Sequence, residues 1–164
     1  STLFEVPYFG RKAYLTQSWQ LYAEAAMPAL ERLYTIAPSF RAEKSRTRRH
    51  LTEFWHAEME VAWASNAEIM SHGEGLVRHI AKTILDEREA ELNSIDRDLD
   101  LLARYADNPY PRMRYDEAVE TLQGMGIEIE WGQDLDYSKE KVLTQDFEVP
   151  HFLSLIHISE PTRR

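Results

Sequence analysis

The sequence contains no cysteine. This excludes disulfide bonds and thiolate metal sites, and it is compatible with a reducing compartment such as the cytoplasm. The six histidines show neither HExxH nor HxxxH spacing, which argues against a structural zinc site. No apolar run approaches the roughly 20 residues that a membrane-spanning helix needs, and no signal peptide is recognisable at the start. We therefore expect a cytoplasmic protein without a membrane partner.

An overall excess of basic residues is also lacking. The net charge is -9, whereas a nucleic-acid-binding protein usually shows a basic face. The balance reverses locally, because between positions 41 and 50 only Glu43 opposes six basic side chains: Arg41, Lys44, Arg46, Arg48, Arg49 and His50. Such a run indicates an anion-binding site or, alternatively, a solvated loop.

The composition itself is that of a globular domain, with 43% hydrophobic and 29% charged residues in 164. Alternation of apolar and polar residues predicts strands in the first part of the chain, at 3–8, 13–16, 34–41 and 52–64, with a turn at 9–12. Apolar residues at helical spacing predict a helix over 20–33, which Ser18 would cap. Pro28 lies inside this pattern and should kink the helix or split it.

The strand predicted at 52–64 has one polar face. This face consists of every second residue of the strand, and its side chains are all polar or aromatic: Thr52, Phe54, His56, Glu58 and Glu60. A face that carries two carboxylates and a histidine is not typical of a hydrophobic core. It is either solvated or part of a site. The basic run connects this strand to the preceding one, and long loops on rigid strands often bind ligands.

The second half of the chain is predicted to be mainly helical. Apolar spacing indicates helix over 66–106, with Gly73 and Gly75 near its start as possible interruptions. A short strand is predicted at 112–115, helices at 116–123 and 138–146, and a strand without a recognisable partner at 148–153. Residues 154–164 resemble a translated sequencing-adaptor artefact. We interpret them as a non-native tail, and we expect sequence to be missing both before Ser1 and after the domain.

The stretch from Phe40 to Phe54 carries the most specific signal. Its sequence, FRAEKSRTRRHLTEF, resembles motif 2 of the class II aminoacyl-tRNA synthetases for aspartate, asparagine and lysine, in which an fRxE start, a basic loop and an RHxxEF end follow one another. The resemblance is strong over 3–64 and looser to about 152. It implies an α+β fold in which residues 1–153 form part of the catalytic domain, an antiparallel sheet flanked by helices.

The resemblance assigns ATP-binding roles to five residues. Arg41 would bridge the amino-acid carboxylate and the α-phosphate, and Arg49 and His50 would hold the β- and γ-phosphates. Phe54 would stack on adenine, while Glu43 would accept from the adenine amino group or meet the tRNA end. The chemistry agrees, because carboxylate attack on a phosphate needs positioned cations more than acid–base groups, and the guanidinium fork suits phosphate oxygens. Lys44, Arg46 and Arg48 are left open between tRNA contact and solvation.

The resemblance also points to the amino acid. Ser18 and Gln20 match residues that hold the substrate in this family. Enzymes for aspartate carry a lysine where this chain has Ala23, and tend to carry Asp where it has Glu58. A carboxylate without a cation repels a second carboxylate, whereas an amide can donate to it. Glu58 therefore favours asparagine, although it is also interpretable as a partner of Arg41.

The resemblance thus implies an asparagine–tRNA ligase activity, with ATP and Mg²⁺ as cofactors, asparagine and tRNA(Asn) as partners, and a homodimer for the full-length protein. No metal ligand is assigned within 1–164, and residues 1–164 alone are expected to be inactive. Three alternatives stay open: an aspartate–tRNA ligase, a paralogue that amidates free aspartate without tRNA, and a non-enzymatic RNA-binding or regulatory module derived from the fold.

Overall fold

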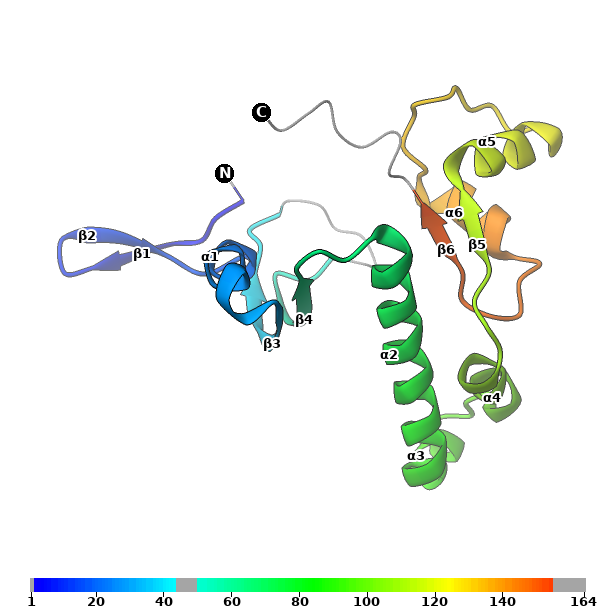
Figure 1. Cartoon of the computed structure of the whole chain (residues 1–164), viewed down its shortest axis with the longest axis horizontal. Helices are drawn as coiled ribbons and strands as arrows, with labels where there is room; N and C mark the ends of the chain where they lie inside the picture. The colour runs from blue at the N-terminus through cyan, green and yellow to red at the C-terminus, as the bar shows by residue number, and fades with distance from the viewer. Residues whose placement is uncertain (1, 44–49, 155–164) are drawn as a thin grey trace. The chain divides into compact units, whose positions relative to one another are not determined.

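A computed structural model of the chain describes residues 2–43 and 50–154. The chain divides into two compact units, Ser1–Ile69 and Met70–Arg164. Figure 1 labels the helices and strands of both units. No helix in the described part of the chain is long and apolar enough to cross a membrane.

The first unit opens with a β-hairpin of β1 (Glu5–Tyr8) and β2 (Arg11–Tyr14), which pair antiparallel with Tyr8 opposite Arg11. The turn consists of Phe9 and Gly10 alone and not of the predicted 9–12. Both residues have positive φ, 43° and 77°. Two consecutive residues with positive φ form the tight turn that matches strand twist, so Arg11 and Lys12 belong to the strand.

Helix α1 (Gln20–Leu30) follows and is shorter than predicted. The helix runs through Pro28 without being split, but Glu31 adopts a left-handed φ of 57° and reverses the chain. The segment predicted as the end of the helix therefore begins strand β3 (Arg32–Phe40). The N-cap position is Trp19; Ser18 Oγ lies one residue earlier and accepts the Gln20 N–H at 3.0 Å.

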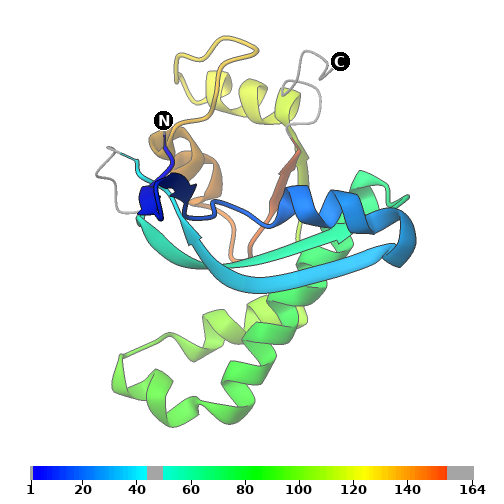
Figure 2. The ribbon, with the colours of Figure 1, turned by 90° about the vertical axis from the view of Figure 1, so that its left-hand side faces the viewer.

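Strand β3 pairs antiparallel with β4 (Glu53–Val61), and α1 packs against this pair (Figure 2). The polar face of β4 is half-buried, and the β3 residues opposite it are small: Thr35 faces Glu58, Ala37 faces His56 and Ser39 faces Phe54. The other face is exposed, with Trp55 at 74%. The half-buried face is thus the polar one.

The second unit starts with three helices, α2 (Asn66–Glu87), whose first residues belong to the first unit, α3 (Glu89–Ser94) and α4 (Leu99–Asp107). Breaks at Arg88 and Asp96 divide the region predicted as helical. Gly73 and Gly75 do not interrupt α2. A Cβ at Gly73 would meet the Phe152 ring at 3.4 Å, so this glycine permits close packing despite its low helix propensity.

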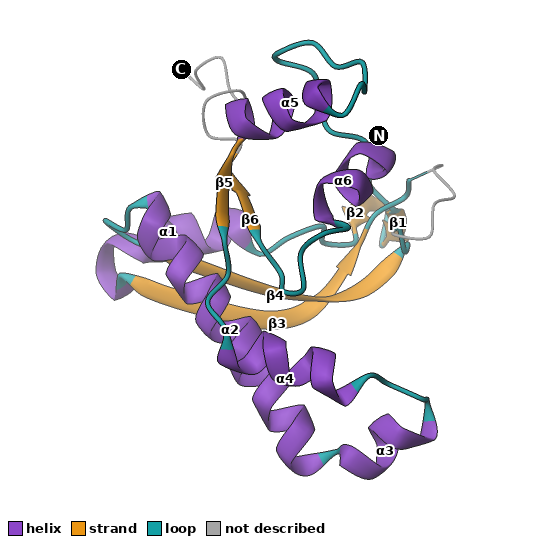
Figure 3. Cartoon of the chain, turned by 90° about the vertical axis from the view of Figure 1, so that its right-hand side faces the viewer, coloured by secondary structure: helices purple, strands orange, loops and turns teal. Residues whose placement is uncertain are grey.

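The second unit also contains a small core around α5 (Tyr115–Gly124), with α6 (Tyr137–Thr144) and the strands β5 (Arg112–Arg114) and β6 (Phe152–Ser154) beside it (Figure 3). Its buried side chains are Tyr115, Ala118, Val119, Leu122, Ile129 and Leu143. The strand without a recognisable partner pairs in parallel with β5, Met113 opposite Leu153.

Candidate active site

A cavity of about 260 Å³ lies where β3 and β4 lead into the basic loop, and its lining includes Arg41, Glu43, His50, Leu51 and Phe54. Four of these five residues are the ones that the sequence assigns to ATP binding. The strands bring them together because Arg41 directly follows β3 and its N–H donates to Thr52 O at 2.9 Å, which closes the end of the strand pair. Arg49 lies outside the described residues.

The guanidinium of Arg41 lies over the Phe54 ring, 5.5 Å from the ring centroid. This cation–π contact holds the charge beside an aromatic face on the half-buried side of β4. Among the described residues Arg41 forms no ion pair with a carboxylate within 4.0 Å, although its charge lowers the pKa of Glu58. Glu43 instead lies 3.6 Å from His50, Oε2 to Nε2.

A second group of predicted residues meets around Glu58. Its Oε1 accepts from Ser18 Oγ at 2.5 Å, and its Oε2 accepts from the backbone N–H of Trp19 at 3.0 Å. Ser18 Oγ in turn accepts from Gln20 N–H. The carboxylate of β4 is thereby bonded to the two residues before α1, about 40 positions away in sequence. Ser18, Gln20 and Glu58 form one connected cluster.

Glu58 is held in its ionised form. Burial on its own raises the pKa of this carboxyl, but the hydrogen bonds from Ser18 and Trp19 and the charges of His56 and Arg41 outweigh burial, and the net pKa lies below the ordinary value of 4.5. Glu60, on the same face, shows the opposite: burial, followed by the charges of Glu24 and Glu58, raises its pKa. An ionised Glu58 is a pure hydrogen-bond acceptor.

Ala23 is fully buried in α1, at 0% exposure. Its methyl side chain carries no charge, so the nearby guanidinium that acts on Glu58 is that of Arg41. Gln20 points its amide nitrogen to Glu24 Oε1 at 3.1 Å, so Ser18 and Gln20, the two residues predicted to hold the amino acid, are both bonded to carboxylates. At the start of α1, the carboxylates of Glu58 and Glu24 are therefore held in place by hydrogen bonds from Ser18 and Gln20.

Two residues near Glu58 were not assigned a role from the sequence. His56 Nδ1 lies 3.5 Å from Glu58 Oε2 and 3.3 Å from Ser39 Oγ. Ser39 is buried, with 2% exposure. The alternation of apolar and polar residues in β4 was enough to place His56 on the polar face from the sequence. Its contact with Ser39 could not be predicted in this way, because it depends on the β3–β4 register.

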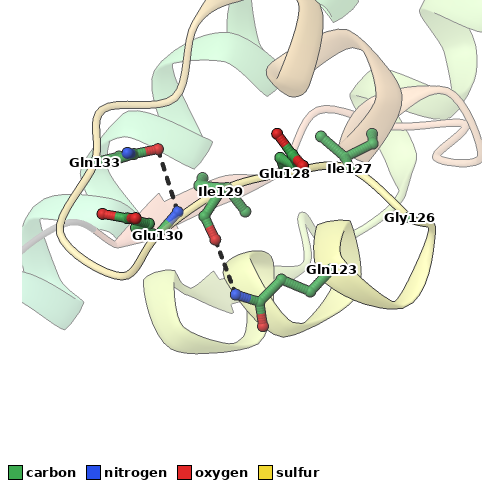
Figure 4. Close-up of a pocket in the computed structure, with 7 residues that line it drawn as sticks. All are labelled: Gln123, Gly126, Ile127, Glu128, Ile129, Glu130 and Gln133. Carbon is green, nitrogen blue, oxygen red and sulfur yellow. Dashed lines mark hydrogen bonds between the residues drawn. The ribbon is translucent and has the colours of Figure 1, made fainter.

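A larger cavity, of about 680 Å³, lies in the second unit beside α5 (Figure 4). Gln123 donates from Nε2 to Ile129 O at 2.9 Å, and Gln133 Oε1 accepts from the Glu130 N–H at 3.2 Å. Its two glutamine side chains thus bond to the backbone of the loop at 129–130. None of the predicted site residues lines it. In the described ranges there is no group of three or more histidine or carboxylate side chains placed to hold a metal ion.

Comparison with known proteins connects this geometry to a family. The chain matches the family described as tRNA synthetases class II (D, K and N) over residues 1–159. It is 51% identical over 153 residues to the asparagine–tRNA ligase of Thermococcus gammatolerans and 48% identical over 156 residues to that of Koribacter versatilis. These alignments cover 93% and 92% of this chain but 35% of each relative, so the chain spans about a third of their length.

Solved structures agree. The asparaginyl-tRNA synthetase of Pyrococcus horikoshii, complexed with asparaginyl-adenylate, superposes with a TM-score of 0.85 at 49% identity, covering 93% of this chain and 35% of that one. The aspartyl tRNA synthetase of Entamoeba histolytica gives 0.68 at 31% identity, covering 87% and 29%. The predicted fold class, part of an α+β synthetase catalytic domain, is therefore confirmed, and the chain belongs to the class II tRNA synthetases of the D, K and N group.

Proposed function

We propose that this chain is the motif 2 part of an asparagine–tRNA ligase, which activates asparagine with ATP to the adenylate and transfers it to tRNA(Asn). The observation that carries the proposal is the Glu58 carboxylate, held by Ser18 Oγ and Trp19 N–H, together with Ala23 at the position where enzymes for aspartate would carry a cation. Glu58 offers an acceptor to an amide and repels a second carboxylate, and Ala23 supplies no cation that would pair with that carboxylate. Relatives named asparagine–tRNA ligases, about half identical to this chain, support it.

In the proposed reaction a carboxylate oxygen of asparagine attacks the α-phosphorus of ATP. A new O–P bond forms, the bond to the bridging oxygen breaks, and pyrophosphate leaves with the electron pair. Arg41 would bind the substrate carboxylate and the α-phosphate and stabilise the growing negative charge. Its position over Phe54 supports this role, because adenine stacked on Phe54 would bring the phosphates to the guanidinium. Arg49 and His50 would hold the β- and γ-phosphates, and Glu43 would accept from the adenine amino group or contact the tRNA end.

The cluster of Ser18, Gln20 and Glu58 would bind the amino acid. Ser18 and Gln20 would orient the backbone of asparagine, and Glu58 would accept from its side-chain NH₂. Hydrogen-bond recognition of this kind discriminates strongly, because a substrate with the wrong group leaves a buried acceptor unpaired. Aspartate would place a second anion against Glu58.

The remaining proposals concern cofactors and partners. Mg²⁺ would accompany ATP and neutralise phosphate charge. The described residues form no cluster for it, so we expect its ligands elsewhere in the complete protein and assign no step to it. The proposed partners are asparagine, tRNA(Asn) and a second copy of the full-length protein, and we place the protein in the cytoplasm, where tRNA is charged.

The test is ATP–pyrophosphate exchange by the protein expressed from its complete reading frame, with asparagine and with aspartate side by side. Exchange that depends on asparagine alone supports the proposal, and charging of tRNA(Asn) would follow. Exchange with aspartate would overturn it in favour of an aspartate–tRNA ligase. Asparagine formed from free aspartate and an amino donor without tRNA would indicate the amidating alternative, and no exchange with either amino acid would indicate a non-enzymatic module.

A further inference from the structure

His56 has contacts on the site face of β4 that the proposed reaction does not use. Its ring packs against Phe54, with centroids 5.5 Å apart, and its Nδ1 lies between Ser39 Oγ at 3.3 Å and Glu58 Oε2 at 3.5 Å. The side chain of His56 is 29% exposed and that of Glu58 is 11% exposed. The histidine therefore stands between the adenine side of the site and the amino-acid side.

The geometry points to His56 as a positioning residue that orients Glu58 for recognition of the asparagine amide, an inference that rests on the proposed function. An ionised carboxylate offers about four acceptor directions. Ser18 Oγ takes one on Oε1, and Trp19 N–H takes one on Oε2. His56 Nδ1 lies against a further direction of Oε2, which leaves about one direction for the substrate NH₂.

The carboxylate also selects the form of the ring. An anion 3.5 Å from Nδ1 favours the tautomer with the proton on Nδ1, directed toward Oε2. Ser39 Oγ then accepts part of the same N–H and keeps the ring from rotating. Ser39 is itself buried on β3. It therefore fixes the orientation of the His56 ring, and the ring in turn orients the Glu58 carboxylate.

The opposite strand makes this arrangement possible. Ala37 faces His56 in the β3–β4 register, and its methyl group leaves the ring room to lean toward Ser39 two positions further along the strand. Such diagonal neighbours are within reach of a ring. His56 therefore contacts residues of both strands.

The experiment uses the protein from its complete reading frame and measures KM for asparagine, KM for ATP and kcat in pyrophosphate exchange. His56→Leu removes the polar contact and keeps an apolar neighbour for Phe54, whereas His56→Asn keeps a polar atom near the position of Nδ1. We expect His56→Leu to raise KM for asparagine about 5-fold or more while KM for ATP changes less than about 2-fold, and His56→Asn to recover most of the loss.

Ser39→Ala provides a second, independent variant. It should also raise KM for asparagine. The double variant with His56→Leu should raise KM for asparagine by less than the product of the two single increases, because both variants act through one contact. An unchanged KM for asparagine, an equal rise in KM for ATP, or failure of His56→Asn to recover activity would overturn the inference. A parent protein that exchanges with aspartate instead would refute the proposed function itself, and would be recognised before any variant is compared.

Discussion

Replacing Glu58 with glutamine tests the central contact of the site with a change of a single atom. The carboxylate accepts from Ser18 Oγ on one oxygen and from Trp19 N–H on the other. Glutamine has one acceptor oxygen, and its NH₂ group would face the second donor. The glutamine oxygen can accept from Trp19 N–H while its NH₂ group donates to Ser18 Oγ, so the variant loses both hydrogen bonds to a charged acceptor and donates where the carboxylate accepted.

The loss can be given a magnitude. A hydrogen bond to a charged group contributes about 1.5–3 kcal/mol, and the same range applies to the substrate amide, which would meet a neutral and partly mismatched group. Since 1.36 kcal/mol corresponds to tenfold in rate, we expect kcat/KM for asparagine to fall about 10- to 150-fold. Aspartate should be discriminated against less strongly, because the repelling charge is gone.

The assay is pyrophosphate exchange with both amino acids, on protein from the complete reading frame and well below its unfolding temperature. Glu60→Gln is the matched control, because Glu60 lies two positions further on the same face, whereas Glu58 is the carboxylate that accepts from Ser18 and Trp19. Unchanged kcat/KM for asparagine in Glu58→Gln would refute the reasoning. An equal loss of kcat/KM for asparagine in Glu60→Gln would show that the effect comes from the negative charge on this face of β4 and not from the contacts of Glu58 with Ser18 and Trp19.

Three further outcomes are expected. Arg41→Ala should lower kcat for exchange about 100- to 1000-fold and also raise KM for asparagine, because Arg41 would bind the substrate carboxylate as well as the α-phosphate, and retention of kcat would contradict its placement at the reacting phosphate. Tyr115→Phe removes a hydroxyl that donates to Gln133 O and accepts from Gly132 N–H, and should cost about 1–3 kcal/mol in urea denaturation; an unchanged midpoint would contradict this. The pKa of Glu60 is raised in the folded chain, so its contribution to stability is present below pH 4.5 and is lost as pH rises through the folded pKa. Glu60→Gln should therefore gain stability relative to the parent above pH 4.5, by about 0.5 kcal/mol, and a gain confined to lower pH would reverse the assigned sign.

Much of the element order could be predicted from local pattern. The alternation in β4 assigned Phe54, His56 and Glu58 to one face, and the described structure places all three there. This succeeds because a strand has a period of two whatever it packs against. The site residues Arg41 and Phe54 came from the resemblance, and the strand pair brings them into contact.

The contacts between distant segments could not be predicted. The β5–β6 pair joins residues about 40 positions apart in parallel, and nothing local to Leu153 identifies Met113 as its partner. Helix α1 ends at Leu30 because Glu31 takes a left-handed φ, although a glutamate is not a typical residue for that conformation. The apolar spacing around Leu33 continued past this point and gave the wrong boundary.

The same limit applies to Glu58, and it has a functional consequence. Residues on one strand can be assigned to a face from the sequence, but the donors that hold Glu58 come from the segment before α1. The carboxylate that would read the substrate amide also fixes the start of the helix that would present Ser18 and Gln20. Replacing it therefore disturbs specificity and local structure together. His56 lies against the carboxylate, and Ser39 lies against His56, so variants at these two β-strand residues can separate the two roles.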